Sequence, residues 1–531
     1  MVSEGEYFNT LTEDELWKRY CGFLDLSLQE FMLIQEHLLL EQLEEIGDTV
    51  LGKKIMGGKK PATVADFRRL VPLTTYDDYS SYLDEKREDV LFEKPYIWLR
   101  TSGRSGAPKW VPYTERAYKA SIRNIVGAII LACTMKKGEV NIKQGERLVC
   151  NLPPPPYGSG IYITSLQEAL NLRVIPPLDL AAQMDFQERI EKGFAMALKT
   201  GVDIVGSLSS VMMKMGETFT NRATGMKFST AMLNPPVLYR IIRAVVRSKL
   251  ERRGMLPKDL WPAKGILAMG TDTTLYKDKI TYYWGKEPYE LYVATEAGVV
   301  ALQSWTKKAM TFLPFFSFFE FIPEKELIKN REDKNYQPST VLLDEVKEGE
   351  RYELVATTFH GIPFLRNRIG DLIQIVALKD EDAGIQTPQM IFSARADDII
   401  DIAGFARFDE KMIWQVLNNT GIQYQDWTVR KEYIGDNPIL HLYIELKQEM
   451  NIDKLHNLLH SSLVVVNSEY EDLENMLEID PLNITLLSKG TFERYYMEKQ
   501  AEGVDLAYLK PPHMNPRDAM VETLLKLSKV T

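Results

Sequence analysis

A short run of small residues that ends in a lysine, residues 101–109, constrains what this chain can fold into and bind. The run reads Thr-Ser-Gly-Arg-Ser-Gly-Ala-Pro-Lys and is flanked by aromatic and apolar residues. Its glycines let several backbone N–H groups point at one anion, Thr101, Ser102 and Ser105 add hydroxyl donors, and Lys109 adds a charge. The spacing is not that of a Walker loop, so the run predicts either a polyphosphate-binding loop of another kind or an ordinary turn.

The composition is that of a large globular protein. The chain has 531 residues, of which 45% are hydrophobic and 26% are charged, so it is long enough for more than one core. A net charge of −10 argues against nucleic-acid binding. Three widely spaced cysteines predict neither disulfides nor a structural zinc site, and they favour a reducing compartment. We see no signal peptide and no apolar run near the ~20 residues of a membrane span, so a cytoplasmic protein is expected.

Strand and helix patterns alternate through most of the chain. Residues 115–136 predict a helix directly after the glycine-rich run. Buried strands are predicted at 149–152, 202–205, 265–270 and 291–294, with helical patterns between several of them. This alternation predicts an α/β fold in which helices flank mixed or parallel sheets, in a large N-terminal domain over residues 1–394.

The character of the sequence changes near residue 392. The polar segment 393–398 is followed by a predicted helix (409–419), an alternating strand (439–446) and another helix (452–463). We expect a small α+β domain over residues 395–531, joined to the first by a hinge. The alternative for residues 395–407 is a polar linker that runs into a strand.

Two acids and a lysine stand where they can assist phosphate binding. Thr295 and Glu296 follow an apolar strand, where Thr295 can donate to a phosphate and Glu296 can hold Mg²⁺. Asp371 follows a glycine at a turn and can accept from both ribose hydroxyls, with Arg368 near the phosphate. Lys510 precedes two prolines on a stiff backbone. The alternatives are a solvated strand-end acid, a β-turn with an ion pair, and a surface lysine.

Two other patterns predict a structural role rather than a functional site. His456 and His460 have the spacing of a helical metal site, but Asn457 stands where a zinc protease has glutamate, so an ordinary helix face is expected. The phenylalanine-rich segment 312–319 is expected to be core.

The order and spacing of these motifs resemble those of the adenylate-forming superfamily of acyl-CoA synthetases, luciferases and peptide-synthetase adenylation domains. The segments that carry this resemblance are 101–109, 292–296, 368–371 and, more loosely, 395–404. Further segments resemble the acyl-acid amido synthetases typified by the plant auxin- and jasmonate-conjugating enzymes, the Gretchen Hagen family. These are 71–77, 318–323, 441–446, 467–470, 490–492 and 508–512.

The resemblance implies an ATP-dependent ligase. Such an enzyme activates a small carboxylic acid as acyl-AMP and then forms an amide with an amino acid or amine. It implies catalytic roles for Thr295, Glu296 and Lys510, Mg²⁺ at Glu296, an acid-pocket wall at Tyr157 and a hinge at Asp397. The implied ATP-binding residues are Thr101, Ser102, Gly103, Arg104, Ser105, Gly106, Lys109, Gly270, Thr271, Tyr292, Arg368, Asp371 and Arg395.

Departures from the family pattern keep two alternatives open. Arg104 stands where the family has a hydroxyl, and one residue separates Tyr508 from Lys510 where the family has none. The loop at 153–160 and the hinge resemble those of acyl-CoA ligases. The alternatives are therefore an AMP-forming acyl-CoA ligase and a catalytically silent nucleotide-binding relative.

Overall fold

The computed structural model divides into two compact units, Met1–Ser393 and Ala394–Thr531. It describes residues 4–101, 109–152, 154–184, 186–223, 234–269, 273–333, 335–402, 406–434, 437–467, 470, 480–502 and 513–529. The assignment of ATP and acid binding to the first unit, and of a mobile lid to the second, stays a prediction.

Most of the strands of the large unit belong to one sheet. The order in this 11-stranded sheet is β10-β11-β12-β13-β9-β8-β7-β6-β5-β3-β4. The strands are β3 (Arg147–Cys150), β4 (Arg173–Ile175), β5 (Ile204–Leu208), β6 (Gly265–Met269), β7 (Tyr289–Ala294), β8 (Gly298–Gln303), β9 (Met310–Phe312), β10 (Ser317–Pro323), β11 (Arg351–Thr358), β12 (Asn367–Ala377) and β13 (Gln389–Arg395). A separate hairpin pairs β1 (Ile97–Thr101) with β2 (Lys109–Tyr113).

The sheet is mixed, which confirms the predicted fold class. Strands β3 to β7 pair in parallel, whereas β7, β8, β9 and β13 pair antiparallel in turn, as do β10, β11 and β12. The predicted buried strands are found as β3, β5, β6 and β7. The predicted helix after the glycine-rich run is α7 (Glu115–Cys133).

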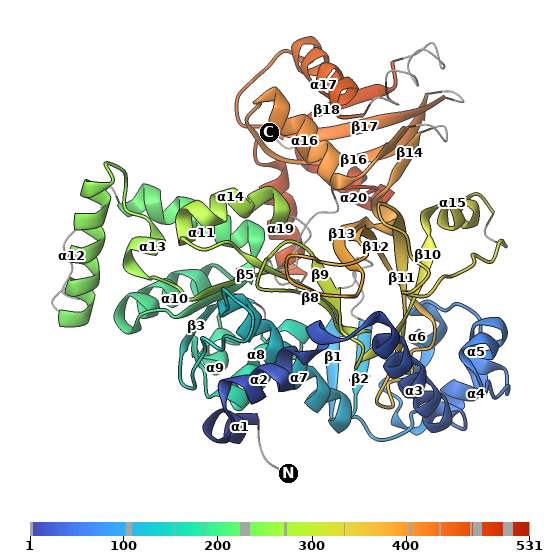
Figure 1. The fold of residues 1–531 in the computed structure, drawn as a ribbon. Coiled ribbons are helices and arrows are strands. Elements are labelled where there is room, and N and C mark those ends of the chain that lie inside the picture. The colour runs from blue at the N-terminus through green and yellow to red at the C-terminus, as the bar shows by residue number, and fades with distance from the viewer. Residues whose placement is uncertain are drawn as a thin grey trace. The chain divides into compact units, whose positions relative to one another are not determined.

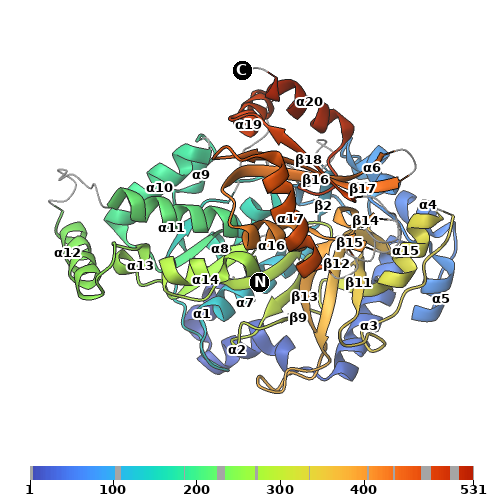
Figure 2. The same cartoon turned by 90° about the horizontal axis from the view of Figure 1, so that it is seen from above.

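Helices cover the large unit at both ends of the sheet. They are α1 (Glu4–Thr10), α2 (Glu13–Cys21), η1 (Gly22–Asp25), α3 (Leu28–Ile46), α4 (Val50–Met56), α5 (Val64–Leu70), α6 (Asp77–Leu83), η2 (Glu88–Val90), α8 (Gly158–Leu170), α9 (Leu178–Ala181), α10 (Phe186–Thr200), α11 (Ser209–Ala223), α12 (Pro235–Leu250), α13 (Pro257–Leu260), α14 (Thr273–Trp284) and α15 (Glu324–Glu332). Figure 1 shows α4 and α5 toward the β10–β12 end, and α10 to α14 toward the β3–β5 end. Figure 2 shows the same two groups of helices on opposite sides of the large unit. No helix in the described ranges is long and apolar enough to cross a membrane.

Helix α7 is the apolar centre of the large unit. The side chain of Thr114 caps it by accepting from the backbone N–H of Ala117 at 3.1 Å. From Ile125 to Cys133 every residue is buried, which accounts for the absence of polar residues in that stretch. The segment 312–319 is also core, since Phe312, Phe316, Phe318 and Phe319 are buried.

The small unit is an α+β fold. Its main sheet orders β16 (Tyr424–Ile434), β17 (Asn437–Leu446) and β18 (Leu482–Leu487), with β16 and β17 antiparallel and β17 and β18 parallel. The remaining elements are η4 (Ala396–Asp398), β14 (Ile400–Ile402), β15 (Ala406–Phe408), α16 (Glu410–Thr420), α17 (Ile452–Val466), α19 (Thr491–Ala501) and α20 (Asp518–Ser528). One core contains residues of α16 and α17, and a second contains residues of α19 and α20.

Candidate active site

The glycine-rich run lies between β1 and β2. Thr101 and Lys109 are paired across the antiparallel hairpin, so the two ends of the run are held together. Lys109 Nζ lies 5.1 Å from the ring centroid of Tyr76, which follows the predicted Val71-Pro72 signature. The Tyr76 hydroxyl donates to Asp84 at 2.8 Å and accepts from the backbone N–H of Trp110 at 2.8 Å. Residues 102–108 lie outside the described residues.

Thr295 and Glu296 form the turn between β7 and β8. The Tyr113 hydroxyl, at the end of β2, donates to the carbonyl oxygen of Thr295 at 2.9 Å. Thr358 Oγ1, at the end of β11, donates to the carbonyl oxygen of Glu296 at 2.6 Å. The backbone of the Thr-Glu turn is therefore held from two sides, and one of these ties it to the strand that carries Lys109.

The N-terminus of α8 meets the same turn. A Cβ built on Gly158 would lie 3.2 Å from Thr295 Oγ1, so glycine permits this approach. Tyr157 is the N-cap residue, and its side chain forms no capping hydrogen bond. The sequence predicted a loop over residues 153–160, and this was wrong for Gly158–Gly160, which form the first turn of the helix. Their glycines serve close packing rather than flexibility.

Glu296 is a half-buried acid without a cationic partner. No ion pair or side-chain hydrogen bond of Glu296 exists within the part of the chain that the structure describes. The charge of Glu296 affects the tyrosines around the turn. Burial and, to a smaller extent, this charge raise the pKa of Tyr162 to about 12. Burial, the neighbouring Tyr162 and then the charge of Glu296 raise the pKa of Tyr113. The turn therefore places a negative charge beside the flanks of the glycine-rich run, where a metal ion can balance it.

Asp371 is held on β12, the third strand from one edge of the sheet. Asp371 on β12 is 7% exposed, and its Oδ2 accepts from the Tyr292 hydroxyl on β7 at 2.7 Å. Arg368 is on the same strand, but its Nη2 lies 2.7 Å from Glu353 and its Nη1 donates to Asn330 at 2.9 Å. The structure thus joins Tyr292 to Asp371, while the Arg368 guanidinium is bound to another acid.

Arg100 is a cation beside the site that the sequence reading missed. It precedes Thr101, its backbone N–H donates to the carbonyl of Pro156 at 2.8 Å, and its guanidinium carbon lies 5.2 Å from the Tyr157 ring centroid. Its Nε is buried, with no hydrogen-bond partner in the described ranges. The signal was a charged residue inside an otherwise apolar strand.

The remaining predicted residues are only partly described. Arg395 ends β13, and Asp397 lies in η4 of the small unit. Gly270, Thr271 and Lys510 lie outside the described residues, as do Ser102, Gly103, Arg104, Ser105 and Gly106. Within the described ranges no group of three or more His, Cys, Asp or Glu side chains is placed so that it could hold a metal ion. His456, on a helix as expected, binds the exposed Asp480 at 2.8 Å.

Solved structures with a similar fold are adenylate-forming enzymes. The structure described as AtGH3.15 acyl acid amido synthetase in complex with 2,4-DB has a TM-score of 0.70 at 18% identity, with 97% of each chain covered. 2-Hydroxyisobutyryl-CoA ligase in its postadenylation state has a TM-score of 0.60 at 14% identity, covering 95% of this chain and 93% of that one.

Curated relatives cover nearly the whole chain. An indole-3-acetic acid-amido synthetase of Arabidopsis thaliana is 23% identical over 86% of this chain and 87% of its own length. A jasmonoyl–L-amino acid synthetase of Nicotiana attenuata is 22% identical over 94% and 93%. The N-terminal, central and C-terminal domain models of the GH3 family match residues 22–152, 310–395 and 410–518, together more than half of the chain. The chain therefore belongs to the GH3 family.

Proposed function

We propose that this protein is an acyl acid amido synthetase, which activates a carboxylic acid with ATP and transfers the acyl group to an amino acid or amine. The observation that carries the proposal is the Thr295–Glu296 turn, which is held against the end of β2 and the start of α8. Membership in the GH3 family supports the same reaction.

In the first step, a carboxylate oxygen of the acid attacks the α-phosphorus of ATP. The bond from that phosphorus to the bridging oxygen breaks, and pyrophosphate leaves as acyl-AMP forms. Both reactants are anionic, so the protein must align them and neutralise charge. We assign the β- and γ-phosphates to the run 101–109, with Lys109 as a cation and Arg104 as a second. Thr295 donates to the α-phosphate.

The nucleoside is held further along the sheet. Asp371 accepts from the ribose hydroxyls, and the Tyr292 hydroxyl fixes the orientation of its carboxylate. Because Arg368 is bound to Glu353, we assign it to orienting this strand. Gly270 and Thr271 are assigned to the edge of the adenine pocket, and Arg395 to the nucleotide.

Glu296 fits a divalent metal ligand, because its half-buried carboxylate has no cationic partner among the described residues. Mg²⁺ binds proteins through one or two carboxylates together with phosphate oxygens and water. When bound, Mg²⁺ supplies charge neutralisation of the phosphates. Lys510 contacts the acid carboxylate and the α-phosphate, a role that suits a mobile point charge.

In the second step, the neutral amine attacks the acyl carbon and the bond to the AMP oxygen breaks. AMP leaves with that oxygen, and the nitrogen loses a proton to give the amide. We propose that the small unit turns about Asp397 between the two steps, and that Tyr157 forms one wall of the acid pocket. The substrates are a small carboxylic acid and a small amine or amino acid.

The test is product identification with the full-length protein. The protein is incubated with ATP, Mg²⁺, pooled carboxylic acids and pooled amino acids, and products are identified by mass. An amide and stoichiometric AMP are expected. The fold of an acyl-CoA ligase is also similar, so a parallel reaction replaces the amines by coenzyme A. A thioester without any amide would favour the acyl-CoA ligase, and no AMP with any acid would favour the silent relative.

A further inference from the structure

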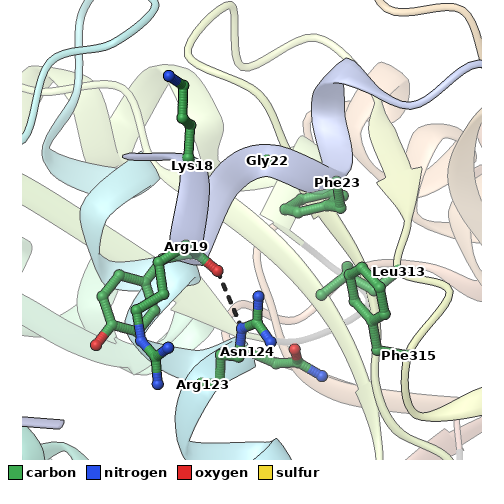
Figure 3. Close-up of a pocket in the computed structure, with 9 residues that line it drawn as sticks. Lys18, Arg19, Gly22, Phe23, Arg123, Asn124, Leu313 and Phe315 are labelled. Carbon is green, nitrogen blue, oxygen red and sulfur yellow. Dashed lines mark hydrogen bonds between the residues drawn. The ribbon is translucent and has the colours of Figure 1, made fainter. Parts of the chain in front are cut away.

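A cavity of about 190 Å³ lies in the large unit between the end of α2 and the middle of α7 (Figure 3). Phe23 of η1 and the segment between β9 and β10, with Leu313 and Phe315, complete its wall. The two helices approach closely because residue 127 is glycine: a Cβ there would lie 2.6 Å from the carbonyl oxygen of Tyr20. The cavity is therefore a feature of how α2 packs on α7.

Arg123 supplies positive charge to this cavity. Its Nε donates to the carbonyl oxygen of Arg19 at 3.0 Å, and its guanidinium carbon lies 5.6 Å from the Phe315 ring centroid. Figure 3 shows the guanidinium reaching from α7 toward that carbonyl, with Phe23 and Phe315 on one side of it. In the described ranges Nη1 and Nη2 have no acceptor, and no carboxylate pairs with Arg123. These two nitrogens form a planar fork that matches a carboxylate.

The neighbouring cations are already compensated. Arg19 pairs with Glu4 and Lys18 with Asp14, each at 2.8 Å, and Figure 3 shows Lys18 directed away from the other labelled side chains. Burial and the repulsion of Arg19 lower the pKa of Arg123, while the charge of Glu4 opposes this effect. Since no carboxylate of the described ranges pairs with Arg123 directly, its guanidinium can bind an anionic occupant.

The wall of the cavity opposite Arg123 is apolar. It contains Phe23, Leu313 and Phe315. One guanidinium and an apolar wall suit an amphiphilic monoanion better than inorganic phosphate.

We propose that this cavity binds a small carboxylate with an aromatic or aliphatic body. The Arg123 fork holds the carboxylate, and the body packs against Phe23, Leu313 and Phe315. Pockets for drug-sized ligands are about 300–1,000 Å³, so this smaller cavity fits a compound of about one ring. None of these residues has a role in the proposed reaction, so the site stands independently of it.

Benzoate is the probe, and arginine modification is the measurement. Phenylglyoxal modifies exposed guanidinium groups, and peptide mass spectrometry gives the rate at each arginine of the full-length protein. We expect saturating benzoate to slow modification of Arg123 about tenfold. Arg116, on the same helix and paired with Glu45 at 2.7 Å, serves as the control and should keep its rate. Benzamide, which has the same shape without the charge, should protect neither residue.

Equal modification of Arg123 with and without benzoate would overturn the proposal, as would equal protection by benzamide.

Discussion

His513 of the small unit offers the sharpest quantitative prediction. Its Nδ1 lies 2.6 Å from Glu410 and its Nε2 lies 2.9 Å from Asp426, while its ring stacks on Trp427 with centroids 4.4 Å apart. Burial disfavours the charged ring, but the hydrogen bonds that it donates to the two carboxylates prevail and raise the pKa of His513 to about 9. The Tyr496 hydroxyl also donates to Asp426, at 2.5 Å. The imidazolium thus joins α16 to β16.

The magnitude follows from linkage. A histidine titrates near pH 6.5 in an unfolded chain, and each unit of pKa difference corresponds to about 1.4 kcal/mol, so the charged ring contributes about 3 kcal/mol. Since the folded pKa is the higher one, this contribution is complete below about pH 6.5 and is lost as the pH rises through about 9. His513→Gln should therefore lower the free energy of unfolding of the small unit by about 3 kcal/mol at pH 6, and by much less at pH 10.

Hydrogen exchange gives a local assay for this prediction. The backbone N–H of Val429 donates to the carbonyl oxygen of His513 at 2.7 Å, so exchange at Val429 reports opening of this contact. At pH 6 the variant should exchange about 100-fold faster, since 1.4 kcal/mol corresponds to a factor of ten. His456→Gln is the matched control, because its partner Asp480 is exposed and such pairs contribute less than about 1 kcal/mol. A pH-independent difference, or equal effects of both variants, would refute the reasoning.

Three further predictions concern the reaction, each measured as acid-dependent ATP–pyrophosphate exchange. Tyr292→Phe removes a hydrogen bond to the carboxylate of Asp371 and should raise the KM for ATP about tenfold, given about 1.5 kcal/mol for a bond to a charged group. Tyr289→Phe on the same strand loses a bond to the carbonyl oxygen of Gln303 and should leave KM unchanged. Equal KM values would contradict the role of Asp371. Gly158→Val should reduce exchange at least tenfold, because its side chain would crowd Thr295. An unchanged rate would contradict the importance of that contact. Gly22→Ala is the control, because a Cβ there meets nothing within 4 Å. Lys510→Ala should reduce exchange by about two to four orders of magnitude while sparing use of preformed acyl-AMP, and equal losses would count against its role.

The fold was predictable where the hydrophobic residues follow a simple pattern along the chain. The fully buried residues of α7 and of the parallel strands β3, β5 and β6 are continuous apolar runs, and they read directly as helix or strand. The antiparallel strands β11 and β12 pair along a bulged register, and the sequence signal for them was weaker. The Pro153–Gly160 segment misled because glycine marks both flexible loops and close packing, and only the position of Thr295 separates the two.

Some residues of the family segments stabilise the fold, and others are assigned to the reaction. The spacing of the segments in the sequence did not show which residues belong to which group. Glu320 of the F-E-F-I-P segment lies 2.8 Å from Arg366, and both are buried. Arg366 also donates to the carbonyl oxygen of Val71 in the N-terminal signature. These residues hold the large unit together and face no substrate in our assignment. The pairs Tyr113–Thr295 and Tyr292–Asp371 join residues 182 and 79 positions apart, so the sequence showed each partner without showing the contact.

A substitution of Glu296, the proposed metal ligand, tests most directly the central claim that the Thr295–Glu296 turn is the site of adenylation. Glu296→Gln removes the negative charge at the turn and keeps the shape of the side chain, and the backbone bond from Thr358 to residue 296 does not depend on that charge. ATP–pyrophosphate exchange with an acid that supports turnover of the wild type should fall to background, while thermal unfolding stays within about 2 °C of the wild type, since half-exposed substitutions change stability by about 0.5 kcal/mol or less. Full exchange in a folded Glu296→Gln protein would contradict the assignment of this turn as the site of adenylation.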